Sequence, residues 1–328
     1  MLGAYQTPDL PRSIVELLLT AAPLALLWTM AWFAVSAGLW WLALLTAVPA
    51  AGFLVRLFMI QHDCGHMSFF KNPVLNNWIG RAIGVLTFTP YDYWRRSHAI
   101  HHATSGNLDR RGTGDVATLT VEEYRALPPL KRFGYRVYRH PAVIFGLGPA
   151  FLFLLQHRLP AGQMRDGWRP WLSALGTDAA IAALVGLAIL LGGWKALLLV
   201  HLPTLLLAAS IGVWLFYVQH QFEQTHYARQ ENWDFTEAAL RGSSNYQLPQ
   251  PLRWMSANIG VHHVHHMSSR IPFYRLPKVL RDFPELQGAS KLTVFQSIRC
   301  VGLSLWDEAN KRLISFAEFR RAERQRNE

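Results

Sequence analysis

The 328-residue sequence is strongly apolar and basic, with 51% hydrophobic residues, only 16% charged residues and a formal net charge of +11. Soluble globular domains carry about 25% charged residues, so this composition excludes an ordinary soluble protein. The positive charge raises the possibility of a nucleic-acid partner, but the sequence holds no nucleic-acid-binding motif. Because its basic residues flank apolar runs, they favour anionic lipid headgroups or an acidic partner protein.

A long apolar run opens the chain. Between residues 17 and 60 the only charged side chain is Arg56. As a continuous helix this run of 44 residues would measure about 66 Å, twice the bilayer core of about 30 Å. It is also too long for the apolar region of a signal peptide. We therefore predict a transmembrane hairpin over about 14–60, with its turn near residues 36–38.

Nine of the fourteen histidines fall in three windows of five residues. The first window, HDCGH, places His62 and His66 directly after the apolar run, and the second, HAIHH, contains His98, His101 and His102. On a helix, residues i and i+4 lie about 40° apart and i+3 shares that face. Each window can therefore aim two or three imidazoles in one direction.

Two features of the central segment bear on the fold. Residues 107–115 are rich in glycine and charge, which predicts a loop, but they lack the glycine spacing and the Lys-Ser/Thr pair of a phosphate-binding loop. Residues 141–156 are apolar but only 16 long, and Gly-Leu-Gly-Pro at 146–149 interrupts them. They are predicted to form a re-entrant or interfacial helix rather than a span.

In a second apolar run, residues 179–219, the only charged side chain is Lys195. This run predicts a second transmembrane hairpin over about 178–219, with its turn near 192–195. His220 ends this run at the same depth as His62. An imidazole at that depth is costly unless it binds something. The third window, HHVHH, follows in the C-terminal part and adds four histidines: His262, His263, His265 and His266.

The number of histidines indicates a metal centre. Neutral imidazole is the commonest protein ligand for ions such as iron, zinc and copper. Eight or more imidazoles are too many for one ion, so the sequence predicts two metals.

The distribution of basic residues predicts the topology. One Lys or Arg precedes the first hairpin, fourteen lie between the hairpins and fifteen follow the second. Both termini and the central segment are therefore predicted to be cytoplasmic, and all three windows then share one compartment. The predicted fold is one all-α integral membrane domain over 1–328. It has four transmembrane helices in two hairpins, a cytoplasmic segment (61–177) with the interfacial helix, and a cytoplasmic helical cap (220–328) that holds the metal site.

The patterns HxxxH, HxxHH and HxxHH, in this order and beside paired apolar segments, resemble the membrane fatty acid desaturase and hydroxylase superfamily over about residues 40–285. The first window lacks an arginine after its first histidine, and the third lies in Asn258–Tyr274. The first resembles acyl-lipid desaturases that act toward the methyl end more than the acyl-CoA stearoyl type, and the third is similar to bacterial members of that group. The resemblance implies two iron ions (Fe2+/Fe3+) and dioxygen as co-substrate. It also implies nine metal ligands: His62, His66, His98, His101, His102, His220, His262, His265 and His266.

Several polar residues are candidates to orient these ligands. A metal-bound imidazole usually donates its other N–H to a carboxylate or carbonyl, and Asp63 is the only carboxylate inside a window. Asp92 and Glu223 are further candidates, although surface or helix-capping roles are equally open for both. His263 departs from the HxxHH spacing and is expected to support the site rather than to bind metal.

Four aromatic residues near the windows could line a channel for an acyl chain or anchor the protein at the membrane interface: Tyr91, Tyr93, Trp94 and Trp254. The two cysteines, Cys64 and Cys300, give no disulfide framework and fit a reducing compartment. Cys64 is expected to be a small buried residue rather than a ligand.

The expected activity is the O2-dependent introduction of a double bond into an acyl chain of a membrane lipid. The sequence has no nucleotide-binding glycine motif, no iron–sulfur cysteine set and no His-Pro-Gly-Gly of a fused cytochrome, so an external electron donor, a ferredoxin or similar carrier, is implied. Two alternatives stay open. One is a hydroxylase or ketolase of the same superfamily acting on a lipid, alkane or carotenoid, and the other is a non-catalytic metal carrier or sensor. The expected location is a bacterial inner membrane, with the active site and both termini cytoplasmic.

Overall fold

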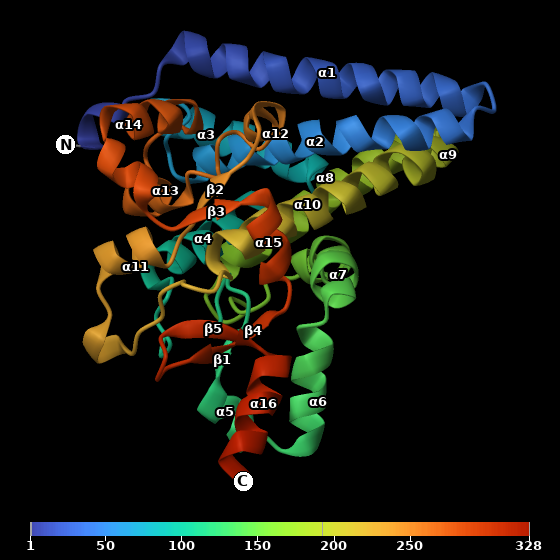
Figure 1. Ribbon diagram of the computed structural model, residues 1–328. Coiled ribbons are helices and arrows are strands. Elements are labelled where there is room, and N and C mark those ends of the chain that lie inside the picture. The colour runs from blue at the N-terminus through green and yellow to red at the C-terminus, as the bar shows by residue number, and fades with distance from the viewer. Residues whose placement is uncertain (1, 192, 328) are drawn as a thin grey trace.

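The computed structural model describes residues 2–191 and 193–327, and it is mostly helical (Figure 1). Among the described residues, four helices are long and apolar enough to cross a membrane. They are α1 (Leu10–Ser36), α2 (Trp40–Gly65), α8 (Trp168–Leu190) and the helix Trp194–His220, which comprises α9 (Trp194–Ala196), the π-helical turn η4 (Leu197–His201) and α10 (Leu202–His220).

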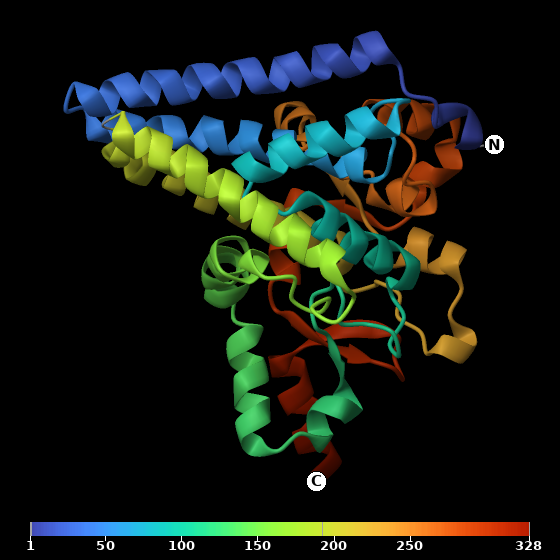
Figure 2. The ribbon, with the colours of Figure 1, turned by 180° about the vertical axis from the view of Figure 1, so that it is seen from behind.

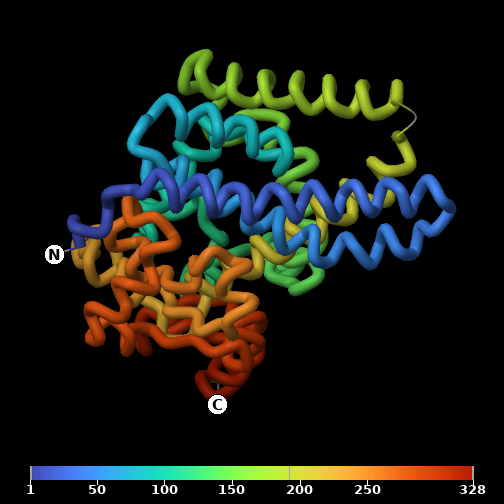
Figure 3. The backbone as a smooth tube through the Cα atoms, turned by 90° about the horizontal axis from the view of Figure 1, so that it is seen from above, coloured from blue at the N-terminus to red at the C-terminus, as the bar shows by residue number. Residues whose placement is uncertain are grey.

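The first two spans form an antiparallel pair, side by side along their length (Figures 1 and 3). Helix α1 begins at Leu10 because the Asp9 carboxylate accepts a hydrogen bond from the backbone N–H of Arg12 at 3.0 Å, which caps the helix. The chain turns at the predicted place, where Gly38 has φ +78°, a conformation that favours glycine. Helix α2 continues to Gly65 and thereby carries His62 on its last turns.

The third and fourth spans diverge from each other. Helix α8 packs against α3 (Pro73–Leu86) and α4 (Tyr91–Thr104) (Figure 2). Helix α10 instead packs along α2. In the most apolar stretch of each helix, 6% of α8 is buried inside the structure, whereas 56% of α2 is buried. Helix α8 therefore presents nearly its whole surface outward, and α2 lies at the centre of the apolar core. The predicted turn near 192–195 includes Gly192, which lies outside the described residues.

The apolar segment after residue 141 does not form one straight helix. Its elements are the π-helical turn η2 (Val143–Leu147), α7 (Gly148–Leu154) and η3 (Gln156–Arg158), and together they bend by 58° from α6 (Pro129–Tyr138). If this bent pair crossed the membrane, the number of spans would be five. Because the second and third histidine windows converge in the fold, an even number of crossings must separate them. This parity favours the predicted four spans.

Reporter fusions test this topology. Fusions after Glu123, after Asp166 and at the C-terminus are expected to report the cytoplasm, and a fusion within residues 192–195 the opposite side. A fusion after Asp166 that reports the outside would show that the bent segment is a span.

The chain is not all-α as predicted, because short strands occur in both its central and its C-terminal parts. A three-stranded sheet has the order β1 (Leu119–Thr120), β4 (Leu303–Asp307) and β5 (Arg312–Ser315), and a second sheet pairs β2 (Asn245–Gln247) with β3 (Lys291–Thr293). Strands β4 and β5 pair antiparallel, with a register irregularity between Leu303 and Leu305. The hairpin closes at a turn where the Asp307 carboxylate accepts from the N–H groups of Ala309 and Asn310.

Short helices complete the extramembrane part around these strands. Besides α3, α4 and α6 they are η1 (Leu2–Tyr5), α5 (Val121–Ala126), η5 (Gln230–Asn232), α11 (Phe235–Arg241), α12 (Gln250–Met255), α13 (His262–Met267), η6 (Phe273–Arg275), α14 (Leu276–Asp282), η7 (Pro284–Gly288), α15 (Val294–Cys300) and α16 (Phe316–Asn327). Helices α11, α13 and α14 gather at the end of the spans that is remote from the α1–α2 turn (Figure 1).

Candidate metal centre

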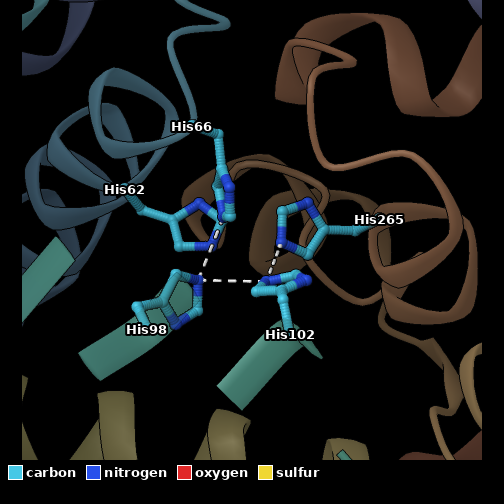
Figure 4. Close-up of side chains that lie close together, drawn as sticks. All are labelled: His62, His66, His98, His102 and His265. Atoms are coloured by element: carbon cyan, nitrogen blue, oxygen red, sulfur yellow. Dashed lines mark hydrogen bonds between the residues drawn. The ribbon is translucent and has the colours of Figure 1, made fainter. Parts of the chain in front are cut away.

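The nine histidines that the sequence analysis proposed as ligands converge in two groups. Within each group the candidate ligand nitrogens lie within 4.8 Å of one another. The first group contains five residues: His62, His66, His98, His102 and His265. The second group contains four: His101, His220, His262 and His266. Figure 4 shows the five rings of the first group pointing toward a common centre from α2, α4 and α13.

Helix geometry explains how one window serves both groups. On α4, His98 and His102 are four residues apart and face the first group, whereas His101 lies about 100° from His102 and faces the second. On α13, His262 and His266 share one face in the same way, and His265 points to the other group. The end of α2 contributes only to the first group, and His220 at the end of α10 only to the second.

The nitrogen spacing fits a metal ion in each group. The Nε2 atom of His98 lies 3.0 Å from that of His66 and 3.1 Å from that of His102. In the second group, the Nε2 atom of His262 lies 3.0 Å from that of His220 and 3.1 Å from that of His266. Two ligands about 2.1 Å from one ion and at right angles to each other are separated by about 3.0 Å, so both groups have the spacing of adjacent ligands.

The protonation state of the imidazoles also fits metal binding. Burial holds the pKa well below its ordinary range for six of the rings: His66, His98, His102, His262, His265 and His266. These rings are therefore neutral at pH 7, and the neutral form offers a lone pair to a metal. Among the described residues, Nε2 of His101 is buried without a hydrogen-bond partner, as expected for a nitrogen reserved for another ligand.

Three of the nine candidate rings, those of His62, His101 and His220, are oriented through Nδ1, which leaves Nε2 free to point into a group. His220 donates from Nδ1 to the carbonyl oxygen of Gly242 at 3.1 Å. Nδ1 of His62 lies 3.4 Å from Oδ1 of Asp63, whose Oδ2 accepts from the backbone N–H of Phe273 at 2.8 Å. Asp63 thus joins the first window to the segment that follows the third.

Sequence analysis missed the closest carboxylate. Oδ1 of Asp115 makes a short contact with Nδ1 of His101. Asp115 lies in the glycine-rich loop, and Gly114 before it has φ +72° and passes so close to α4 that an added Cβ would lie 3.2 Å from the Cβ of His101. A carboxylate next to a glycine, shortly after a histidine window, was the available signal.

The Asp115 contact supplies a testable prediction. Asp115→Asn is expected to weaken metal retention by about 10- to 100-fold, because an amide is a poorer partner for the N–H of a metal-bound imidazole. Release of the ion to a colorimetric chelator measures this effect. Asp92→Asn is the matched control and should change retention by less than about twofold, since Asp92 forms a surface ion pair. Equal retention by both variants would contradict the role of Asp115.

Two other carboxylate candidates do not reach the histidines. Asp92 accepts from Nε of Arg81 at 2.8 Å, and Glu223 accepts from Arg312 at 3.1 Å. Within residues 2–191 and 193–327 neither has a hydrogen bond to a histidine. Both are partly exposed and pair with arginines on the surface, one of the roles that sequence analysis had left open.

His263 points away from both groups, and its Nε2 lies 2.9 Å from the carbonyl oxygen of Leu286. It belongs to neither group, and Cys64 is likewise buried outside both.

Of the four aromatic candidates, Trp94 packs against a ligand candidate, and its ring stacks on that of His98 at 4.8 Å. The hydroxyls of Tyr91 and Tyr93 donate to the carbonyl oxygens of Cys64 and Ala161, both at 2.9 Å. The ring of Trp254 lies 4.0 Å from the guanidinium carbon of Arg56. These three side chains hold helices and loops together.

Comparison with known proteins agrees with this arrangement. The profile described as "Fatty acid desaturase" matches residues 39–297, which include all nine histidines. A "Fatty acid desaturase" of Bacillus subtilis is 43% identical over 314 residues, which cover 96% of this chain and 88% of the relative.

Two cyanobacterial relatives are less similar in sequence. The "sn-1 acyl-lipid omega-3 desaturase (ferredoxin)" of Synechocystis is 30% identical over 241 residues, covering 71% of this chain and 64% of that protein. The "sn-1 oleoyl-lipid 12-desaturase" of the same organism is 28% identical over 239 residues, covering 72% of this chain and 67% of the relative. The profile and the Bacillus relative each span most of the sequence, and the chain therefore belongs to the fatty acid desaturase family, a family of oxidoreductases.

Proposed function

We propose that the protein is an O2-dependent acyl-lipid desaturase whose two irons are held by the two histidine groups. The observation that carries this proposal is the convergence of nine buried or half-buried imidazoles into a set of five and an adjacent set of four. Rings of the two groups are in contact, since His102 and His266 stack at 4.2 Å. Adjacent ions held in this way could act together on one substrate.

The chemistry defines what the residues must provide. Removing two hydrogens from adjacent unactivated methylenes needs an oxidant stronger than any side chain, and a bound iron pair with O2 would supply it. The balanced reaction is R–CH2–CH2–R′ + O2 + 2 e− + 2 H+ → R–CH=CH–R′ + 2 H2O. Two C–H bonds are broken, the C=C π bond forms, and O2 is reduced to water. The histidines hold the ions, and Asp63, Asp115 and the Gly242 carbonyl orient three of the rings.

The names of the relatives support the proposed lipid substrate and electron donor. Those of the cyanobacterial proteins specify lipid-linked acyl chains, and one specifies ferredoxin as the donor. They favour desaturation over the hydroxylase alternative and a soluble one-electron carrier as the reductant. The positive charge on the segments outside the candidate spans supports an inner-membrane enzyme whose active site and termini are cytoplasmic.

Metal and lipid analysis of the expressed protein test this proposal. Protein from iron-replete cells is expected to contain about two irons per chain, and lipids of the expressing host to gain double bonds. The His98→Ala variant, which lacks a first-group imidazole, should form no new double bonds. The His140→Ala variant, changed at an exposed histidine, should form as many as the unmodified protein. Full activity with zinc alone would refute the di-iron proposal, and hydroxylated lipids in place of alkenes would favour the alternative.

A further inference from the structure

A solvent-facing pocket reaches both histidine groups. Its volume is about 390 Å3, and its walls include His102 from the first group and His266 from the second. These two rings stack, with centroids 4.2 Å apart and planes inclined by 19°. Its lining residues come from the N-terminal segment, α4, the start of α11 and the end of α13 with the loop that follows it. Helices α11 and α13 lie at the end of the molecule that is remote from the α1–α2 turn (Figure 1).

The rim of this pocket suits close approach by another protein. On α4 it is formed by Ala99 and Ala103, whose small side chains are exposed and one helical turn apart. Phe235, at the start of α11, is 42% exposed and adds an apolar contact. Gln6 donates to the hydroxyl of Ser268 at 2.9 Å, which fixes the N-terminal segment against the loop after α13.

The charge at the rim is positive. Arg270 lines the pocket, is exposed and has no acidic partner among the described residues. The acidic side chains on the neighbouring α11 are already engaged, since Asp234 caps that helix and Glu237 pairs with Arg241 at 2.6 Å. The free charge at the rim therefore belongs to Arg270, in a chain with a net charge of +11.

We propose that this pocket and its rim, defined by Ala99, Ala103, Phe235 and Arg270, form the docking surface for an acidic one-electron carrier. The inference rests on the proposed function, because each turnover oxidises two reduced carriers and delivers one electron from each. Electron transfer weakens steeply with distance, so the carrier must approach where a ligand ring borders solvent. His102 of the first group is half-buried and meets this requirement at the opening, and the buried ring of His266 from the second group stacks on it. Opposite charge on the carrier would speed the encounter and orient it.

Direct binding tests the surface independently of catalysis. The protein in nanodiscs of neutral phosphatidylcholine would be titrated with an acidic [2Fe–2S] ferredoxin by biolayer interferometry. Arg270→Glu is expected to raise the Kd about five- to tenfold at low salt, and the difference should shrink above about 0.3 M salt. The KM for reduced ferredoxin should rise in parallel. Arg270→Lys should stay within about twofold of the unmodified protein.

A matched variant separates docking from net charge. Arg320→Glu makes the same charge change at an exposed position on α16, far from the pocket (Figure 1), and should leave the Kd within about twofold. Unchanged iron content in Arg270→Glu would show that the histidine groups are intact. The proposal is overturned if Arg270→Glu binds ferredoxin as well as the unmodified protein, or if both glutamate variants lose binding equally. It is also overturned if Arg270→Glu loses affinity only for anionic phospholipid vesicles, which would make the rim a headgroup site.

The proposed function is tested separately by giving the unmodified protein dithionite in place of the carrier. Double bonds formed with dithionite support that function whatever the ferredoxin titration shows. If dithionite gives no product but Arg270→Glu still weakens ferredoxin binding, the docking surface stands and the desaturase assignment fails.

Discussion

His220→Ala is expected to abolish desaturation and to lower the iron content from about two toward about one per chain. His220 is the only member of the second group that comes from a membrane span, and its Nε2 lies 3.0 Å from that of His262. Its Nδ1 is already held by the Gly242 carbonyl, so the ring is fixed with Nε2 facing the group. Without it only three imidazoles remain there: His101, His262 and His266. Metal analysis of the purified variant and lipid analysis of the host measure the two effects.

His263→Ala is the matched control because it removes a buried imidazole from α13, next to His262 in sequence. The ring of His263 is buried, but its Nε2 faces the Leu286 carbonyl. We expect both irons to be retained and turnover to fall only in part, through loosened packing behind α13. If His220→Ala kept both irons and normal product, His220 would be a packing residue and the eight window histidines would be the ligand set.

Much of the candidate site could be predicted from the sequence because its residues are local and repeated. The spacing of His98 and His102, or of His262 and His266, places two rings on one helix face whatever the tertiary structure. The apolar runs likewise predicted four spans, since few other structures satisfy the backbone of such segments in a bilayer. The turn at Gly38 could be anticipated because glycine is the residue that tolerates its backbone conformation.

The division into two groups could not be predicted in this way. His101 and His102 are neighbours in sequence, and their separation into different groups depends on where the ends of α2, α10 and α13 lie around α4. Asp115 was missed for the same reason, because the loop must fold back over α4 before its carboxylate meets His101. A sequence window shows which residues share a helix face but not which loop returns to that face.

Nearness in sequence to the histidine windows was a poor guide to the carboxylates that support the site. Asp92 and Glu223 lie near the windows in sequence, yet each pairs with an arginine elsewhere, Arg81 and Arg312. In a chain with 32 basic and 21 acidic side chains, a carboxylate meets an arginine more readily than an imidazole. Asp63 differs because it is buried on α2 beside His62 and binds the Phe273 backbone.

The single charge inside the first apolar run leads to the second prediction with a large effect. Arg56 is only 1% exposed, and its guanidinium pairs with Glu16 of α1, which is 2% exposed. The same guanidinium donates to the carbonyl oxygen of Trp254, and its carbon lies 5.2 Å from the ring centre of Phe273. Arg56 therefore joins both helices of the first pair to the C-terminal segment that carries the third window.

Glu16→Ala is expected to destabilise the protein by about 3–5 kcal/mol, because it leaves the Arg56 charge buried without its partner. The loss should appear as a lower unfolding temperature in detergent, followed by circular dichroism. Arg12→Ala removes the other partner of Glu16, an ion pair of 2.6 Å whose arginine is 55% exposed, and should cost at most about 1 kcal/mol.

Replacing both buried charges distinguishes a pairing requirement from a packing requirement. In the double variant Glu16→Leu with Arg56→Met, no unpaired charge remains at either position, and apolar side chains of similar size fill the space. We expect most of the stability lost in Glu16→Ala to return, although the Trp254 carbonyl loses its donor. An unfolding temperature of Glu16→Ala equal to that of the unmodified protein would show that water or lipid headgroups reach Arg56. The first helix pair would then be joined to the third window by apolar packing alone.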